Sequence, residues 1–281
     1  MLLFVAAFPL AAGAQWRLEA DGHRVYDDNL SRAQRSEDIL DDSAWTGRVA
    51  LARRLALGDW DASVHVEGRA ERYDEFSGLD RLALGLGGSA RRKLGLGLTA
   101  PWLGLSASVL RDRYDQEVRD GTRLALAATL GKRFSERLEL SAGAGYDRRE
   151  QRKDLATTPV SGKPFSLQGR SLSLNGNYAF TDRLLLLASA ARRQGDVVSS
   201  TRRNFQIFTE SSAIADDPAF GPDFIAYRLS GARTHSYSLG LSWELWRRAT
   251  IDAFATRSDT KARGGLDYDS NGYSVAFGYR Y

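Results

Sequence analysis

The last nine residues of the chain, 273–281, read YSVAFGYRY, and they decide the fold. Apolar or aromatic side chains stand at every second position, with small or polar residues between them: Tyr273, Val275, Phe277, Tyr279 and Tyr281. This period of two predicts a β-strand that runs to the final residue. A strand that faces lipid has a use for an aromatic end, because aromatic side chains are enriched at membrane interfaces. The alternative interpretation is an edge strand of a soluble β-sandwich.

The segment resembles the terminal strand that bacterial outer-membrane β-barrels present to their assembly machinery. The resemblance covers residues 16–281 as a class of barrel and identifies no particular family. It implies that the chain lies in the cell outer membrane, with outer-membrane lipid, lipopolysaccharide and the β-barrel assembly machinery as partners. The four residues YDDN at 26–29 also resemble the opening of barrel domains in polysaccharide-secretion and surface-lipoprotein-export proteins.

The N-terminus indicates export. Residues 1–14 read MLLFVAAFPLAAGA, an apolar core that ends with Ala12 and Ala14 in an Ala-x-Ala arrangement. This pattern is typical of a secretory signal peptide, and the segment is too short to span a bilayer as a helix. We therefore expect a signal peptide at 1–14 and one outer-membrane barrel at 15–281.

Composition agrees with an exported barrel. The chain has 281 residues and no cysteine, which excludes disulfides and thiolate metal sites. A net charge of +4 is too mild to suggest a nucleic-acid partner. The mean hydropathy of −0.37 is also expected of a transmembrane barrel, because only alternate residues of each strand face lipid.

Alternating segments recur along the whole chain. We predict an all-β fold, a closed antiparallel transmembrane barrel of about twelve strands. The predicted strands are 16–26, 44–56, 60–72, 79–91, 102–114, 122–133, 137–149, 169–180, 183–193, 234–245, 249–258 and 271–281. An amphipathic helix does not produce this pattern, since its period is 3.6 residues.

The lengths of the connections support the same fold. Short turns are predicted near 58–59, 134–136, 181–182 and 246–248, and long loops at 27–43, 73–79, 115–121, 150–168, 194–233 and 259–270. Alternation of short and long connections is typical of short periplasmic turns and long extracellular loops. The connection around 92–101 fits this alternation less well.

The inward face of the predicted barrel is polar. On 60–72 the face opposite the apolar residues is far too charged for a sandwich core. The candidate pore-lining residues are Arg48, Arg54, His65, Glu67, Arg69 and Glu71. Charged side chains in a pore set its selectivity, and the three arginines favour anions or sugar acids. Structural salt bridges without a role in transport are the alternative.

Other inward positions carry small residues such as Gly85, Ser106 and Gly143. Small inward side chains leave space in a barrel of this size and favour an aqueous channel. The alternative is that they allow the sheet to curve while a long loop plugs the interior. The loop 194–233 contains several phenylalanines and isoleucines, so we expect it to fold against the barrel or inward as a constriction.

Two charged segments have open interpretations. The acidic segment 25–42 could hold Ca²⁺ through its clustered carboxylates, or it could simply be solvated; its spacing matches no EF-hand. The segment 147–153 carries four basic residues beside Tyr146, and it could bind lipopolysaccharide phosphates or form a solvated loop. The four are Arg148, Arg149, Arg152 and Lys153.

The sequence predicts a porin-like outer-membrane channel for small, anionic or saccharide solutes, passing passively or under a gate. The alternatives are an export barrel for polysaccharide or surface lipoprotein, working with a periplasmic or secreted partner, and an outer-membrane hydrolase. Only His23, His65 and His235 could serve as catalytic bases, and no hydrolase motif surrounds them. We expect no catalytic residues, no cofactor and no metal site.

Overall fold

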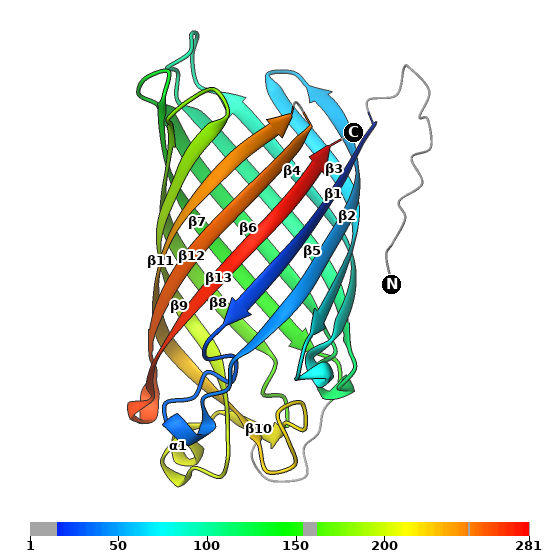
Figure 1. Cartoon of the computed structure of the whole chain (residues 1–281), viewed down its shortest axis with the longest axis vertical. Coiled ribbons are helices and arrows are strands. Elements are labelled where there is room, and N and C mark those ends of the chain that lie inside the picture. The colour runs from blue at the N-terminus through cyan, green and yellow to red at the C-terminus, as the bar shows by residue number, and fades with distance from the viewer. Residues whose placement is uncertain (1–15, 154–161, 247, 281) are drawn as a thin grey trace.

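The computed structural model describes residues 16–153, 162–246 and 248–280. In these ranges twelve strands form a closed antiparallel barrel (Figure 1). Its strands are β1 (Trp16–Asp27), β2 (Asp42–Leu57), β3 (Trp60–Tyr73), β4 (Arg81–Lys93), β5 (Trp102–Tyr114), β6 (Gly121–Arg133), β7 (Leu138–Gln151), β8 (Leu167–Ala179), β9 (Leu184–Thr201), β11 (Ile225–Trp246), β12 (Ala249–Lys261) and β13 (Asp267–Arg280). The predicted fold class and strand count are confirmed, and most boundaries agree within two or three residues.

Two pairings close the barrel. The C-terminal strand β13 pairs with β1, so that Phe277 lies opposite Gly22, and β9 pairs with β11. A further short strand, β10 (Ala213–Asp216), pairs with the beginning of β11 and stands outside the barrel. Closure leaves no exposed sheet edge along the barrel wall, which a lipid environment requires.

The outer face of the barrel is apolar because every second residue along the strands is apolar, and these residues all point outward. On β4, Leu82, Leu84 and Leu86 are each at least 63% exposed, although all three are large hydrophobic residues. In water such an apolar surface would promote aggregation, whereas in a membrane it contacts the hydrocarbon of the bilayer. No helix in the described residues is long and apolar enough to cross a membrane.

The two ends of the barrel differ. The β2–β3 turn consists only of Gly58 and Asp59, and Gly58 adopts φ 59°, which a glycine tolerates without strain. This end also carries the first described residue of β1 and the end of β13 (Figure 1). The other end carries the long connections, including helix α1 (Phe205–Glu210) and the 3-10 helices η1 (Ser36–Asp38), η2 (Ser77–Leu79), η3 (Glu117–Arg119) and η4 (Arg263–Gly265).

The connection 94–101 is an exception at the short-turn end. It is longer than its counterparts, and Leu96 is 99% exposed. The predicted strand near 102 nevertheless begins where expected, at Trp102.

The predicted loop 194–233 was wrong in its extent. Strand β9 continues to Thr201, and β11 begins at Ile225, directly opposite Thr201. The intervening connection is therefore 202–224. A β-bulge between Leu229 and Ala232, with Gly231 at φ 75°, interrupts the alternation of β11 and obscures it in the sequence.

Candidate functional site: the barrel interior and its cap

Glu67 is the centre of a charged cluster on the inner wall of β1, β2 and β3. Its side chain is 1% exposed, and it accepts hydrogen bonds from Arg48 Nε at 2.6 Å and from Arg69 at 3.0 Å. Arg48 also lies 3.4 Å from Asp21 and 3.5 Å from Glu19. One guanidinium therefore bridges three carboxylates, and this wall is close to neutral rather than basic.

The other three predicted pore-lining residues share the inward face with Glu67 but not its cluster. Arg54 pairs with Asp61 at 2.7 Å near the short-turn end. Glu71 pairs with Arg81 at 2.9 Å toward the long-loop end. The ring of His65 covers Gly87 of β4, since a Cβ added there would lie 2.4 Å from Nε2. Their inward placement agrees with the sequence, and their role in transport stays a prediction.

A second ionic cluster surrounds Asp112 of β5. Its side chain is fully buried and lies 3.3 Å from Arg81 and 3.2 Å from Arg123. Sequence reasoning missed this cluster, because the alternation of β5 and β6 identified the inward face but not the pairing across strands. The two clusters together give the inner wall of β1–β6 a network of ion pairs.

Hydroxyl groups cover the opposite wall. Across β11 and β12, Thr234 contacts Thr260 at 2.9 Å, and Ser236 contacts Ser258 at 2.8 Å. Thr256 donates to Ser238 at 3.0 Å in the next pair. This wall offers neutral donors and acceptors and no fixed charge at these positions.

Two cavities lie in the part of the interior that the described residues form. One, of about 500 Å³, lies toward the short-turn end and is lined by both walls, including Asp21, Arg48 and Asp252. The other, of about 280 Å³, lies at the long-loop end, and we call it the chamber. The arginines that line the chamber are Arg32, Arg119, Arg149 and Arg193.

Residues 202–224, which we call the cap, cross the mouth of the barrel. Ala219, Phe220 and Phe224 are buried in a cluster with Leu79, and the Phe220 ring lies 5.3 Å from that of Phe76. In the circular strand order, four strands separate β11 from β3 and four separate β4 from β9. The β3–β4 connection is thus opposite the origin of the cap, and the cap spans the opening. The expectation that this loop packs onto the rest of the barrel is confirmed.

A buried ion pair holds the middle of the cap. Asp217 has a fully buried side chain and accepts two hydrogen bonds from Arg119 of η3, at 2.5 and 3.1 Å. Ser200 of β9 donates to the same carboxylate. The bidentate geometry gives this contact orientation as well as strength. Breaking it would leave a buried charge unpaired, which is strongly destabilising.

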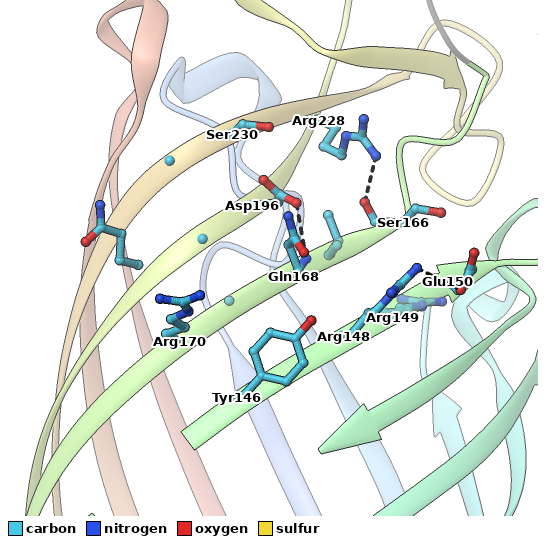
Figure 2. A pocket seen from close by; sticks show the side chains of 15 residues that line it. Tyr146, Arg148, Arg149, Glu150, Ser166, Gln168, Arg170, Asp196, Arg228 and Ser230 are labelled. Carbon is cyan, nitrogen blue, oxygen red and sulfur yellow. Dashed lines mark hydrogen bonds and ion pairs between the residues drawn. The ribbon is translucent and has the colours of Figure 1, made fainter. Parts of the chain in front are cut away.

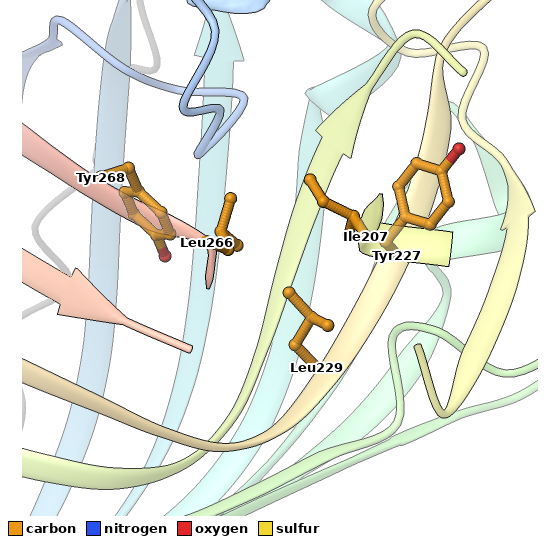
Figure 3. Close-up of a cluster of buried hydrophobic side chains, with 5 residues drawn as sticks. All are labelled: Ile207, Tyr227, Leu229, Leu266 and Tyr268. Carbon is orange, nitrogen blue, oxygen red and sulfur yellow. The ribbon is translucent and has the colours of Figure 1, made fainter. Parts of the chain in front are cut away.

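Helix α1 anchors the beginning of the cap. Asn204 caps the helix by accepting from the backbone N–H groups of Gln206 and Ile207. Ile207 then packs into a buried cluster drawn from β11 and from the β12–β13 connection and β13 (Figure 3). The other members of this cluster are Tyr227, Leu229, Leu266 and Tyr268.

The acidic segment after β1 uses its carboxylates for separate structural contacts. Asp27 pairs with Arg32, Asp38 pairs with Arg202 of the cap, and Asp28 accepts from Asn271. Asp42 accepts from the backbone N–H groups of residues 75 and 76. Within the described ranges no group of three acidic or histidine side chains is placed to hold a metal ion.

The basic segment 147–153 is mostly strand rather than loop, which corrects the prediction. Because β7 extends to Gln151, Arg148 and Arg149 point to opposite faces. Arg148 lines a hollow of about 840 Å³ on the outer wall, beside Tyr146 and Arg170 (Figure 2). Arg148 pairs there with Glu150, whereas Arg170 is exposed and forms no ion pair with the described residues.

The outer rim at the long-loop end carries an aromatic residue beside charges. Arg24 lies 5.2 Å from the ring centroid of Trp45, which is 62% exposed. Its hydrogen bond to Asp74 lowers the pKa of that carboxyl below its ordinary value. A tryptophan at this height is typical of the aromatic belt of a membrane protein.

The C-terminal strand is placed as its sequence predicts. Tyr273, Val275, Phe277 and Tyr279 all point outward and are 37% to 56% exposed. Tyr281 and the predicted signal peptide at 1–14 lie outside the described residues. The role of this strand as an assembly signal stays a prediction.

The histidines show no catalytic arrangement in the part of the chain that the structure describes. His23 contacts Asp21 at 2.9 Å, but no serine hydroxyl hydrogen-bonds either of them. His235 and Ser236 point to opposite faces of β11. A histidine and carboxylate pair without a nucleophile gives no basis for a hydrolytic mechanism.

Comparison with solved structures supports the fold. The chain is similar to an outer-membrane channel of Pseudomonas putida F1, with a TM-score of 0.61, 9% identity, and coverage of 96% of this chain and 97% of that one. It is also similar to the KdgM porin in complex with disordered oligogalacturonate, at a TM-score of 0.48 and 10% identity over 93% and 98% of the two chains. At 9% identity, the likeness to the Pseudomonas putida channel shows the barrel fold alone. No family model and no curated protein matches the sequence.

Proposed function

We propose that this protein is an outer-membrane channel for small solutes, and that the cap closes its extracellular mouth. The observation that carries the proposal is the position of the cap. Phe220 and Phe224 pack against Leu79 of the β3–β4 connection, on the far side of the mouth. Below them the interior contains a cavity and strands lined by hydroxyl groups. A barrel with no solute to pass would have little use for a covered, polar interior.

The exposed apolar band favours a membrane location for the barrel. Leucines on β4 and β8 and aromatic residues on β13 form an exposed apolar surface that would promote aggregation in water. The long-loop end would then face the outside and the short-turn end the periplasm. Membrane fractionation tests this: the protein should stay with outer membranes in high salt and migrate faster on gels when unheated.

Liposome swelling tests the channel and the cap together. Because Thr201 and Ile225 lie directly opposite each other, residues 202–224 can be replaced by an Asn-Gly turn that continues the β9–β11 hairpin. Liposomes with this cap-replaced variant should swell in small neutral sugars faster than liposomes with wild type. If neither protein permits swelling, the channel proposal is wrong, and an export barrel filled by a partner protein becomes the better account.

The outer hollow favours contact with a phosphorylated outer-leaflet lipid. On β8, Arg170 stands on the same face as Leu172 and Leu174, which are 66% and 59% exposed. A cation above an apolar column matches the phosphate and acyl chains of such a lipid. The variant R148Q/R170Q should retain less lipopolysaccharide after purification than R92Q, a matched change that breaks an ion pair near the short-turn end. Equal retention would contradict this contact.

A further inference from the structure

We propose that the chamber beneath the cap binds a small solute bearing a carboxylate or phosphate group, with Arg149 as its principal contact. The chamber is lined by four arginines and a single acidic residue, Asp196. Phe220 of the cap forms part of its lining. This inference rests on the proposed channel function and names the class of solute that the channel accepts.

Arg149 differs from the other arginines of the chamber because it forms no ion pair with a carboxylate of the described residues. Arg32 pairs with Asp27, Arg119 with Asp217, and Arg193 with Asp147. Those three are fixed by their partners. Among the described residues Arg149 forms no ion pair, and its guanidinium donates only to the backbone carbonyl of Arg119.

The surroundings of Arg149 leave one donor unused. Its Nε is buried without a hydrogen-bond partner. Its guanidinium lies 5.1 Å from the ring centroid of Tyr114 and 6.0 Å from that of Phe165, which hold it in place. Arg149 is half-buried and lines the chamber, so an oxyanion held there would pair with the part of its guanidinium that faces the cavity. The guanidinium is thus preorganised for a planar, charged acceptor.

The size and access of the chamber limit the solute. A cavity of about 280 Å³ is just below the usual range for ligand pockets, about 300–1,000 Å³, and suits a sugar acid or a similar monomer. The cap covers the outer side, so with the cap in place the solute reaches Arg149 through the barrel interior. Phe165 and Tyr268 offer apolar surface for the remainder of the solute.

Calorimetric titration of the purified, refolded barrel tests the site directly. D-glucuronate and inorganic phosphate are the anionic probes, and D-glucose is the neutral one. We expect wild type to bind both anions in preference to glucose. R149Q should weaken anion binding by about 10- to 100-fold, the loss of one charge-assisted hydrogen bond. The anion affinity of R149K should lie between those of wild type and R149Q, because lysine keeps the charge but not the planar donor fork.

R92Q is the matched control, since it removes one positive charge near the short-turn end, away from the chamber, and should bind as wild type does. The proposal is overturned if glucose binds wild type as tightly as glucuronate, or if R149Q keeps wild-type affinity. If R149Q does not fold into a heat-modifiable barrel, the wild-type preference and R149K decide the outcome. Conductance without anion binding would refute the chamber site alone, and anion binding by wild type without conductance in either wild type or the cap-replaced variant would refute the channel alone.

Discussion

The short-turn end and the long-loop end of this barrel are held together by different kinds of contact. At the short-turn end, neighbouring strands are joined by tight turns, and the terminal strand β13 meets β1 to close the wall. At the long-loop end, segments distant in sequence interlock: Asp217 contacts Arg119, and Phe220 contacts Phe76. The barrel wall is therefore set by local pairing and the cap by long-range side-chain contacts. Damage at the first end should abolish the barrel, whereas damage at the second should open it.

The largest expected effect is at the short-turn end. Deleting residues 279–281 removes the pairing of Tyr279 with both Ala20 and Ala249, and with it one outward aromatic of the proposed assembly signal. We expect no folded barrel in the outer membrane, as judged by immunoblotting of unheated samples. Y281F, which keeps an aromatic end, should assemble normally. Wild-type levels of the deleted form would show that closure does not depend on these residues.

Next in size is a change in the cap. F220A/F224A removes two buried rings, each worth about 3–5 kcal/mol when truncated in a packed core. We expect the cap to lose its hold on the opposite wall while the barrel stays heat-modifiable, which limited proteolysis of intact cells would detect as cleavage within 202–224. F205A is the matched control, since Phe205 belongs to the same segment but is 80% exposed. Equal cleavage of all three proteins would contradict the role of the buried rings.

A charge in the apolar band should have a somewhat smaller effect. V275R places arginine in the middle of the outward face of β13 and should cost about 2–4 kcal/mol of folding free energy in bilayers. Y273R, at the aromatic edge of the same face, should cost about 0–1 kcal/mol. Denaturant unfolding in lipid vesicles measures both. Similar costs for the two would mean that Val275 does not face the hydrocarbon.

The smallest effect is expected on selectivity. Replacing Arg48, Arg54 and Arg69 with glutamine removes three positive charges and takes the ion-pair partners of Glu67 and Asp61 away, so the interior becomes more negative. In the cap-replaced channel, the ratio of anion to cation permeability should fall, and E67Q should raise it. Reversal potentials in a salt gradient measure the ratio. No change in either variant would assign these ion pairs a structural role only.

The barrel wall could be predicted from sequence because its signal is local. Alternation with a period of two identifies a strand and its lipid face without knowledge of the strand it pairs with. Examples are Leu82, Leu84 and Leu86 on β4, and 273–277 on β13. The same rule identified the inward position of Glu67 and Arg69. It failed on β11, where the bulge at Gly231 places both Leu229 and Ala232 on the inner face and breaks the alternation.

The cap and the chamber could not be predicted in this way. Asp217 and Arg119 are 98 residues apart, and nothing near either residue indicates the other. The predicted strand 137–149 includes Arg149, and its alternation with Arg148 was a usable signal that the interpretation of 147–153 as a basic loop did not use. Which arginines are neutralised depends on pairing across strands, and a single sequence does not contain that information.

The central claim is that a hollow barrel is closed at one end by a removable cap. Single-channel recording in planar bilayers tests it most directly, with wild type compared to the variant in which an Asn-Gly turn replaces residues 202–224. We predict small or rare openings for wild type and a larger, persistent conductance for the variant. Equal conductance of the two proteins would show that the cap does not close the pore, and no conductance in either would show that the barrel is not a channel.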